Sequence, residues 1–302
     1  MAYLFVFFTE EKIKDGEQVY FAVSKDGLNW TDLKEEGPIL KSDVGDKGVR
    51  DPFILYNPLD TNYYIIATDL RIAAGKGWKH ANTCGSKDII VWKSTDLLQW
   101  QKGVGVRLHA MEALHAGCVW APEAYYDQRR KVFVMYWASL VGCWQKMYAA
   151  DTVDFQHFTN YRLFMESEEH IIDTTIVEDK GHFYRFSVNY GGIGMDRVDS
   201  IAEVSPNCEG KIIPIEGMKG MEGGIVLYLD SLQKWCLYAD DSSHAAGYIP
   251  FLCNDLESGE FKRLSPGKYD MGKRLKRHGS IIKIADDVYE RLIMFYGRAM
   301  NR

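Results

Sequence analysis

The chain has 302 residues and no linker-like interruption, so we expect one large domain over residues 1–302. Its formal net charge of −6, without an extended block of Lys and Arg, argues against nucleic acid and membrane partners. With 8 Trp, 18 Tyr and 14 Phe, the chain is rich in residues that favour strands. The six cysteines include no Cys-x-x-Cys pair, so we expect reduced core residues, as in a cytoplasmic protein.

The N-terminal segment predicts a strand rather than a targeting signal. Residues 3–9 form an apolar run without a basic flank, and the run is too short for a signal peptide or a membrane span. A second strand is expected at residues 19–23. These features favour a protein that stays in the cytoplasm, and no protein partner is indicated.

A short pattern then recurs five times along the chain. Each copy has a carboxylate or imidazole residue, a small residue or proline, and an apolar run typical of a strand. The copies begin at Asp51, Glu123, Asp173, Glu222 and His278. A repeat of about fifty residues predicts a radial array of four-stranded blades whose equivalent strand starts meet at one axis. We therefore predict an all-β, five-bladed β-propeller with five polar residues facing one another.

A second signature predicts the turns between strands. Ser or Thr, then Asp, then an aromatic residue occur in order within residues 24–30, 94–100 and 152–158. The Ser, Thr and Asp side chains can cap a turn through local backbone hydrogen bonds, so we interpret this signature as structural. Helical periodicity is weak throughout, with at most a single turn at residues 200–204.

The two ends of the chain are predicted to share one blade. The strands at residues 3–9 and 19–23 precede any polar strand start, whereas the strand at 278–284 has little chain behind it. Pairing these segments closes the ring and removes a free sheet edge. The basic residues within 273–277, just before the last strand, are interpreted as a solvated loop.

Carboxylates gathered at an axis suggest a chemistry. Cleavage of a glycosidic bond needs one protonated carboxyl to donate a proton to the leaving oxygen and one carboxylate to activate water or attack the sugar. A third carboxylate nearby can raise the pKa of the acid by like-charge repulsion. The predicted axis offers four candidates, which are Asp51, Glu123, Asp173 and Glu222.

These residues resemble the motifs of family 43 glycoside hydrolases. The matching segments are Asp51-Pro52, Trp120-Ala121-Pro122-Glu123, Ile172-Asp173, Glu222-Gly223 and Arg277-His278-Gly279-Ser280. The resemblance implies a five-bladed propeller and an inverting mechanism on arabinose- or xylose-containing glycans. It also implies that Asp51 is the general base, Asp173 the modulator of the acid's pKa, and Glu222 the general acid.

The chain departs from the family pattern at three positions. Thr174 and Gly224 stand where the family usually has proline, and Glu123 where it often has aspartate. The resemblance implies that His278 faces a central ion, often calcium, or its water shell. Calcium prefers oxygen ligands, so a hydrogen-bonded axis histidine without a metal is the alternative.

Other residues are candidates for holding the sugar. A glycine-rich insertion at residues 73–80 could bring Trp78 over the pocket, and Trp120 and Trp144 are further platforms. Arg185 and Arg298 could donate hydrogen bonds to hydroxyl groups or pair with axis carboxylates. For the tryptophans, packing between blades is an equally good interpretation.

The sequence thus predicts an inverting exo-glycosidase. Its expected substrates are terminal α-L-arabinofuranosyl or β-D-xylosyl residues on short oligosaccharides derived from hemicellulose or arabinan. Two alternatives stay open. One is an endo-acting arabinanase, and the other is a non-hydrolytic propeller that only binds sugar.

Overall fold

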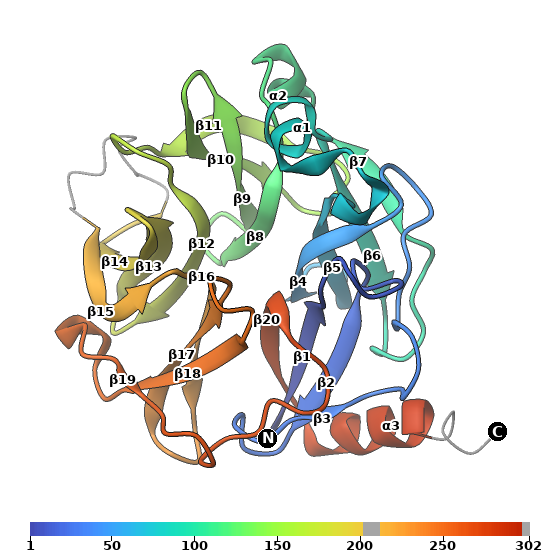
Figure 1. Ribbon diagram of the computed structural model, residues 1–302, viewed down its shortest axis with the longest axis vertical. Coiled ribbons are helices and arrows are strands. Elements are labelled where there is room, and N and C mark those ends of the chain that lie inside the picture. Colours follow the sequence, from blue (N-terminus) through green and yellow to red (C-terminus); the bar gives the residue numbers. More distant parts are fainter. Residues whose placement is uncertain (202–211, 298–302) are drawn as a thin grey trace.

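The computed structural model describes residues 1–201 and 212–297, which form five four-stranded antiparallel sheets around a central axis (Figure 1). Each innermost strand contacts the innermost strand of the next sheet, so the ring is continuous. The predicted all-β, five-bladed β-propeller is confirmed.

We number the blades from the first sequence repeat, so that blade 5 contains the first and last strands. Blade 1 consists of β4 (Val49–Asn57), β5 (Asn62–Asp69), β6 (Asp88–Ser94) and β7 (Val104–Arg107). Blade 2 consists of β8 (Trp120–Asp127), β9 (Val132–Val141), β10 (Trp144–Thr152) and β11 (Thr159–Met165). Blade 3 consists of β12 (Ile172–Asp179), β13 (His182–Asn189), β14 (Gly192–Val198) and β15 (Ile213–Lys219). Blade 4 consists of β16 (Met221–Leu229), β17 (Lys234–Asp241), β18 (Gly247–Cys253) and β19 (Lys262–Arg263). Blade 5 consists of β20 (Arg277–Ile284), β1 (Ala2–Phe8), β2 (Tyr20–Ser24) and β3 (Thr31–Asp32).

Blade 5 closes the ring as predicted. Strand β20 pairs antiparallel with β1, beginning with Ala2 opposite Ile284. A side chain reinforces the junction with blade 1, because the Ser280 hydroxyl accepts a hydrogen bond from the Ile54 N–H (2.7 Å) and donates one to the Pro52 carbonyl (3.1 Å). The last strand is therefore bonded to both its blade and the neighbouring blade.

Strand β1 shows how the blades pack. All seven of its residues are buried. Leu4 and Val6 belong to one hydrophobic cluster, whereas Tyr3 and Phe5 belong to another. Alternate residues of a strand point to opposite faces, so both faces of this blade are covered by its neighbours.

The Ser/Thr and Asp signature forms the predicted capped turns. The Ser24 hydroxyl accepts a hydrogen bond from the Gly27 N–H at 2.9 Å, and Asp26 caps the following N–H groups. The turns after Ser94 and Thr152 repeat these bonds. The signature is therefore structural, as its residue types indicate.

The helices were poorly anticipated. The described residues contain η1 (Ile72–Ala74), α1 (Gly77–Cys84), α2 (His109–Ala113), η2 (Leu256–Ser258) and α3 (Asp286–Gly297). The expectation of almost no helix is wrong for α3, whose Leu292 and Tyr296 pack into a blade core. The single turn expected at residues 200–204 lies largely outside the described residues. None of the described helices is long and apolar enough to cross a membrane.

Candidate active site

A bulge lies near the start of every innermost strand. In β4 the pairs Arg50–Thr68 and Phe53–Ile66 flank two residues that oppose a single partner. The other four innermost strands have the same two-against-one irregularity. Bulges re-aim side chains and are frequent beside active sites, so the five strand starts are shaped to present groups at the axis.

The bulges correct the register that the sequence repeat implied. The first bulge residues, in blade order, are Asp51, Ala121, Asp173, Gly223 and His278. Glu222 therefore lies one residue before this position, and Glu123 lies two residues after it. Only three of the five predicted polar residues are structurally equivalent, because the sequence pattern does not reveal where the extra residue enters.

Backbone strain marks the two equivalent aspartates. Asp51 and Asp173 both have a φ of 52°. Positive φ is unfavourable for a residue with a Cβ atom and persists where the surrounding structure imposes it. The strain is consistent with carboxylates that are held in a fixed direction.

The ring of His278 lies between these carboxylates. Its Nδ1 is 3.4 Å from Asp51 Oδ1 and 3.7 Å from Asp173 Oδ2. The Thr68 hydroxyl donates a hydrogen bond to Asp51 (2.8 Å), and the Gly223 N–H donates one to Asp173 (3.2 Å). The three ionisable side chains are only 8–14% exposed. The structure thus brings together three of the predicted site residues.

Burial and mutual charge change the proton affinity of this group. Burial raises the pKa of Asp173 to about 7, the charge of His278 opposes the rise, and the charges of Glu222 and Asp51 add to it. Burial alone would lower the pKa of His278, but Asp173, Asp51, Glu123 and Glu222 raise it above its ordinary value. Because one imidazolium lies among several carboxyl groups, the protonation of each of these side chains depends on the protonation of the others.

Glu222 joins the cluster through an arginine that the sequence analysis did not assign to the site. Arg277 donates a hydrogen bond from Nη2 to Glu222 Oε1 (3.0 Å) and another from Nε to Asp240 Oδ2 (2.7 Å). Burial raises the pKa of Asp240 to about 6, and Arg277 opposes this rise. An acidic residue directly after the apolar run 235–239 is the signal that could have identified Asp240.

The interpretation of residues 273–277 as a solvated loop is wrong for two of its cations. Arg277 is the first residue of β20 and is mostly buried. The Lys276 side chain is fully buried, and its Nζ lies 2.6 Å from Asp32 Oδ1. A buried cation requires a paired acid, and the partners come from distant parts of the chain.

Glu123 lies deeper than the other candidates. It is 5% exposed and accepts a hydrogen bond from the Tyr136 hydroxyl at 3.2 Å. Burial raises its pKa to about 8, while the His278 charge opposes the rise. Burial therefore favours the protonated form of Glu123, which directly follows the two bulge residues of β8.

Two of the three candidate tryptophans, Trp78 and Trp120, contact each other, whereas Trp144 lies apart from them. Trp78, on α1, is 49% exposed and lies with its ring 4.8 Å from the guanidinium carbon of Arg50. The same ring makes an edge contact with Trp120, with 6.1 Å between centroids. Trp144 packs edge-on against His170. The insertion thus brings Trp78 against Arg50, the residue that precedes Asp51.

The two arginines predicted to contact sugar are placed differently. Arg185 is buried, and it forms a two-point ion pair with Asp196 on β14, including Nε to Oδ1 at 2.9 Å. This guanidinium is almost fully enclosed by the protein and pairs with Asp196. Arg185 therefore does not make the contact with sugar or with the axis carboxylates that the sequence predicted. Arg298 lies outside the described residues.

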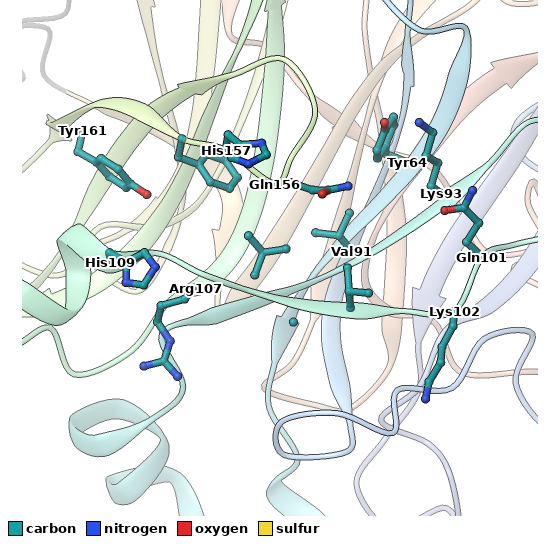
Figure 2. Close-up of a pocket in the computed structure, with 14 residues that line it drawn as sticks. Tyr64, Val91, Lys93, Gln101, Lys102, Arg107, His109, Gln156, His157 and Tyr161 are labelled. Carbon is teal, nitrogen blue, oxygen red and sulfur yellow. The ribbon is translucent and has the colours of Figure 1, made fainter.

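A separate cavity lies between the outer strands of blades 1 and 2 (Figure 2). It has a volume of about 710 Å³ and is lined by Arg107, His109 and Tyr161, among others. None of its lining residues belongs to the axis cluster. The gathered ionisable groups, rather than cavity size, locate the candidate active site.

The donor set around His278 does not fit a directly coordinated calcium ion. Its Nδ1 faces the carboxylates of Asp51 and Asp173 as an ion-pair partner. Within residues 1–201 and 212–297, no group of three or more His, Cys, Asp or Glu side chains could hold a metal ion. Calcium also prefers six to eight oxygen ligands. We therefore derive no chemical step from a metal.

Strained, buried carboxylates at the axis of a five-bladed propeller define the class of the protein as a glycoside hydrolase. Residues 1–290 match a family model described as a probable glycosyl hydrolase domain, related to glycoside hydrolase family 43. The chain belongs to this family, and the resemblance seen in the sequence is confirmed.

Known proteins agree with this assignment. An α-L-arabinofuranosidase of Bifidobacterium longum subsp. longum is 30% identical over 173 residues, which cover 51% of this chain and 16% of that protein. The matched region is thus a small part of that relative. Two solved structures share the fold. The putative exo-β-1,3-galactanase of Bifidobacterium bifidum S17 has a TM-score of 0.60 at 12% identity, with 91% of each chain covered. An endo-1,4-β-xylanase of Bacteroides thetaiotaomicron has a TM-score of 0.61 at 14% identity, with 93% of this chain and 94% of that chain covered.

Proposed function

We propose that the protein is an inverting exo-glycosidase that releases terminal α-L-arabinofuranosyl or β-D-xylosyl residues from short oligosaccharides. The observation that carries the proposal is the contact of Asp51, Asp173 and His278 at the axis, with Gly223, next to Glu222, bonded to Asp173. The arabinofuranosidase relative supports the arabinose option.

The proposed roles follow from this geometry. Glu222 donates its proton to the glycosidic oxygen as the bond between that oxygen and the anomeric carbon breaks. Asp51 accepts a proton from the water whose oxygen bonds to the anomeric carbon on the opposite face. Asp173, bonded to the backbone of Gly223, tunes and positions Glu222. The products are the free sugar, with inverted configuration at its anomeric carbon, and the remaining oligosaccharide, whose hydroxyl group has received the proton.

The insertion before β6 supports exo action. Glu17 accepts hydrogen bonds from the N–H groups of Ile72 (2.8 Å) and Ala73 (2.9 Å), which fixes η1 to blade 5. On the other side, Gln145 donates a hydrogen bond to Asn82 of α1 (3.1 Å). In this proposal the insertion, which is held through η1 on one side and α1 on the other, forms a wall on the side of blades 1 and 2, where Figure 1 shows α1 beside α2.

Within this proposal, that wall provides the sugar platform. Trp78 and Trp120 present aromatic surface near the axis, and such faces stack on the apolar side of a sugar ring. A platform that also blocks one side of the pocket favours a terminal residue over the middle of a polymer. We assign both tryptophans to substrate binding, and Glu123 to shaping the pocket from below.

The test is hydrolysis of nitrophenyl α-L-arabinofuranoside and β-D-xyloside by the wild type and by Glu222→Gln. The wild type should release the inverted anomer, as followed by proton NMR, and the variant should lose roughly 10²- to 10⁴-fold in kcat on an oligosaccharide of the same sugar, whose leaving group needs the proton. Full turnover by Glu222→Gln would remove the acid assignment. Running the assay with and without a chelator tests the calcium expectation separately.

Two further outcomes would select the alternatives. Dimers and trimers released from linear arabinan, without free arabinose, would show endo action. Binding of oligosaccharide by calorimetry with no release of reducing sugar over hours would show a non-hydrolytic propeller.

A further inference from the structure

We propose that Asp240 is a positioning residue. It orients Glu222 through Arg277 and partly offsets the positive charge of Arg277. This inference rests on the proposed role of Glu222 as the general acid. Asp240 lies on β17 directly opposite Glu222 on β16, and β16 adjoins β20, which carries Arg277 (Figure 1). Three strands thus bring the three side chains together.

The buried end of this chain of contacts is Asp240. Its side chain is fully buried, and Oδ2 accepts hydrogen bonds from Arg277 Nε (2.7 Å) and from the His278 N–H (3.2 Å). Its Oδ1 has no hydrogen-bond partner among the described residues. A buried carboxylate with an unpartnered oxygen is unfavourable for stability, so a functional reason for keeping it is expected.

Arg277 carries the constraint from the buried end to the exposed end. Its planar guanidinium donates hydrogen bonds to Asp240 through Nε (2.7 Å) and to Glu222 through Nη2 (3.0 Å). The Arg277 side chain is 11% exposed, whereas that of Glu222 is 34% exposed. A rigid fork anchored in the interior therefore fixes the direction of a more mobile carboxyl group.

Charge gives Asp240 a second effect. A guanidinium that faces only Glu222 would favour its ionised form and oppose its proton donation. Asp240 supplies a second carboxylate to the same guanidinium. Arg277 can then position Glu222 while the positive charge of the guanidinium is partly offset by Asp240. The His278 N–H bond extends the constraint to the residue that lies between Asp51 and Asp173.

The test is Asp240→Asn, which keeps the shape but removes the charge, assayed on two kinds of leaving group. An oligosaccharide needs proton donation, whereas a dinitrophenyl glycoside leaves without it. We expect kcat to fall roughly 10²-fold on the oligosaccharide and less than about threefold on the dinitrophenyl substrate. An equal loss on both, or no loss on either, overturns the inference.

The matched control is Asp196→Asn, which breaks the equally buried ion pair with Arg185 in blade 3. It should lower the thermal midpoint without changing the ratio of the two rates. If Asp240→Asn does not fold, Arg277→Lys keeps the charge but lacks the fork, and the same selective loss is expected. No selective loss in a folded Arg277→Lys variant would also overturn the inference.

The proposed function can be tested independently of the role of Asp240. Glu222→Gln should show the same dependence on the leaving group. If Glu222→Gln loses oligosaccharide turnover but Asp240→Asn does not, only the role of Asp240 is wrong. If Glu222→Gln keeps full turnover, the assignment of the acid itself is wrong.

Discussion

Replacing Glu123 by glutamine should make the protein more stable at alkaline pH. The carboxyl group of Glu123 is buried, and its pKa is raised from 4.5 to about 8, mainly by burial. In the unfolded chain the group ionises near its ordinary pKa, whereas in the folded protein it keeps its proton. Glutamine has nearly the same shape, can still accept the hydrogen bond from Tyr136, and cannot ionise.

The size of the effect follows from the difference between the two pKa values. Above pH 4.5 the unfolded state binds fewer protons than the folded state, so the stability of the wild type falls as pH rises. The loss is about 1.4 kcal/mol per pH unit, and it is complete near pH 8. The Glu123→Gln variant should therefore gain up to about 5 kcal/mol over the wild type above pH 8, and almost nothing at pH 4.5.

Urea denaturation of both proteins at pH 5, 7 and 8.5 measures this difference. Subtracting the two free energies of unfolding cancels the contributions of titrating groups that do not interact with Glu123, whereas Asp173 and His278 interact with it. Glu168→Gln, a change at an exposed carboxylate, serves as the control and should give a difference that does not vary with pH. The same flat result for Glu123→Gln would mean that Glu123 is ionised in the folded protein, and would refute the reasoning.

Three other changes test different parts of the structure. Trp78→Ala should raise KM for oligosaccharides roughly tenfold, with Trp144→Ala as the control; equal effects would contradict the assignment of Trp78 as the platform. Asp173→Asn should remove an ionisation near pH 7 from the pH profile of kcat/KM, because the pKa of Asp173 is about 7; an unchanged profile would assign that ionisation elsewhere. Lys276→Met should lower the free energy of unfolding by about 3 kcal/mol by leaving Asp32 with a buried, unpaired charge. Adding Asp32→Asn should restore part of this loss, and no recovery would show that the pair is not the cause.

The architecture was predictable because the repeat is visible in the residue types of the sequence. Five similar strand starts gave the blade number, and the unmatched strands at the two ends gave the closure. The register at the axis was not predictable in the same way. A bulge depends on backbone dihedral angles, and Ala121 adopts the positive φ that Asp51 adopts in the preceding blade, although the two residues share no chemistry.

The partners of the predicted residues were also beyond the sequence. The contact of Arg277 with Asp240 joins residues 37 positions apart through two blades. Nothing in the basic run 273–277 itself indicates that Arg277 pairs with Asp240. Trp78 was identified as a candidate because glycines mark an insertion, but only the three-dimensional arrangement places it against Arg50 and Trp120. Sequence thus identified the carboxyls at the axis better than the groups that contact them.

The closure of the ring has a consequence for the order of assembly. The last strand, β20, both completes blade 5 and carries Arg277 and His278. During synthesis, Asp51, Asp173 and Glu222 all emerge before the residues that hold and neutralise them. Four blades alone would leave these carboxylates without their cationic partners. Pairing of β20 with β1 therefore closes the propeller and supplies the cationic partners of these carboxylates in the same step. A nascent chain acquires its active centre only when this strand is in place.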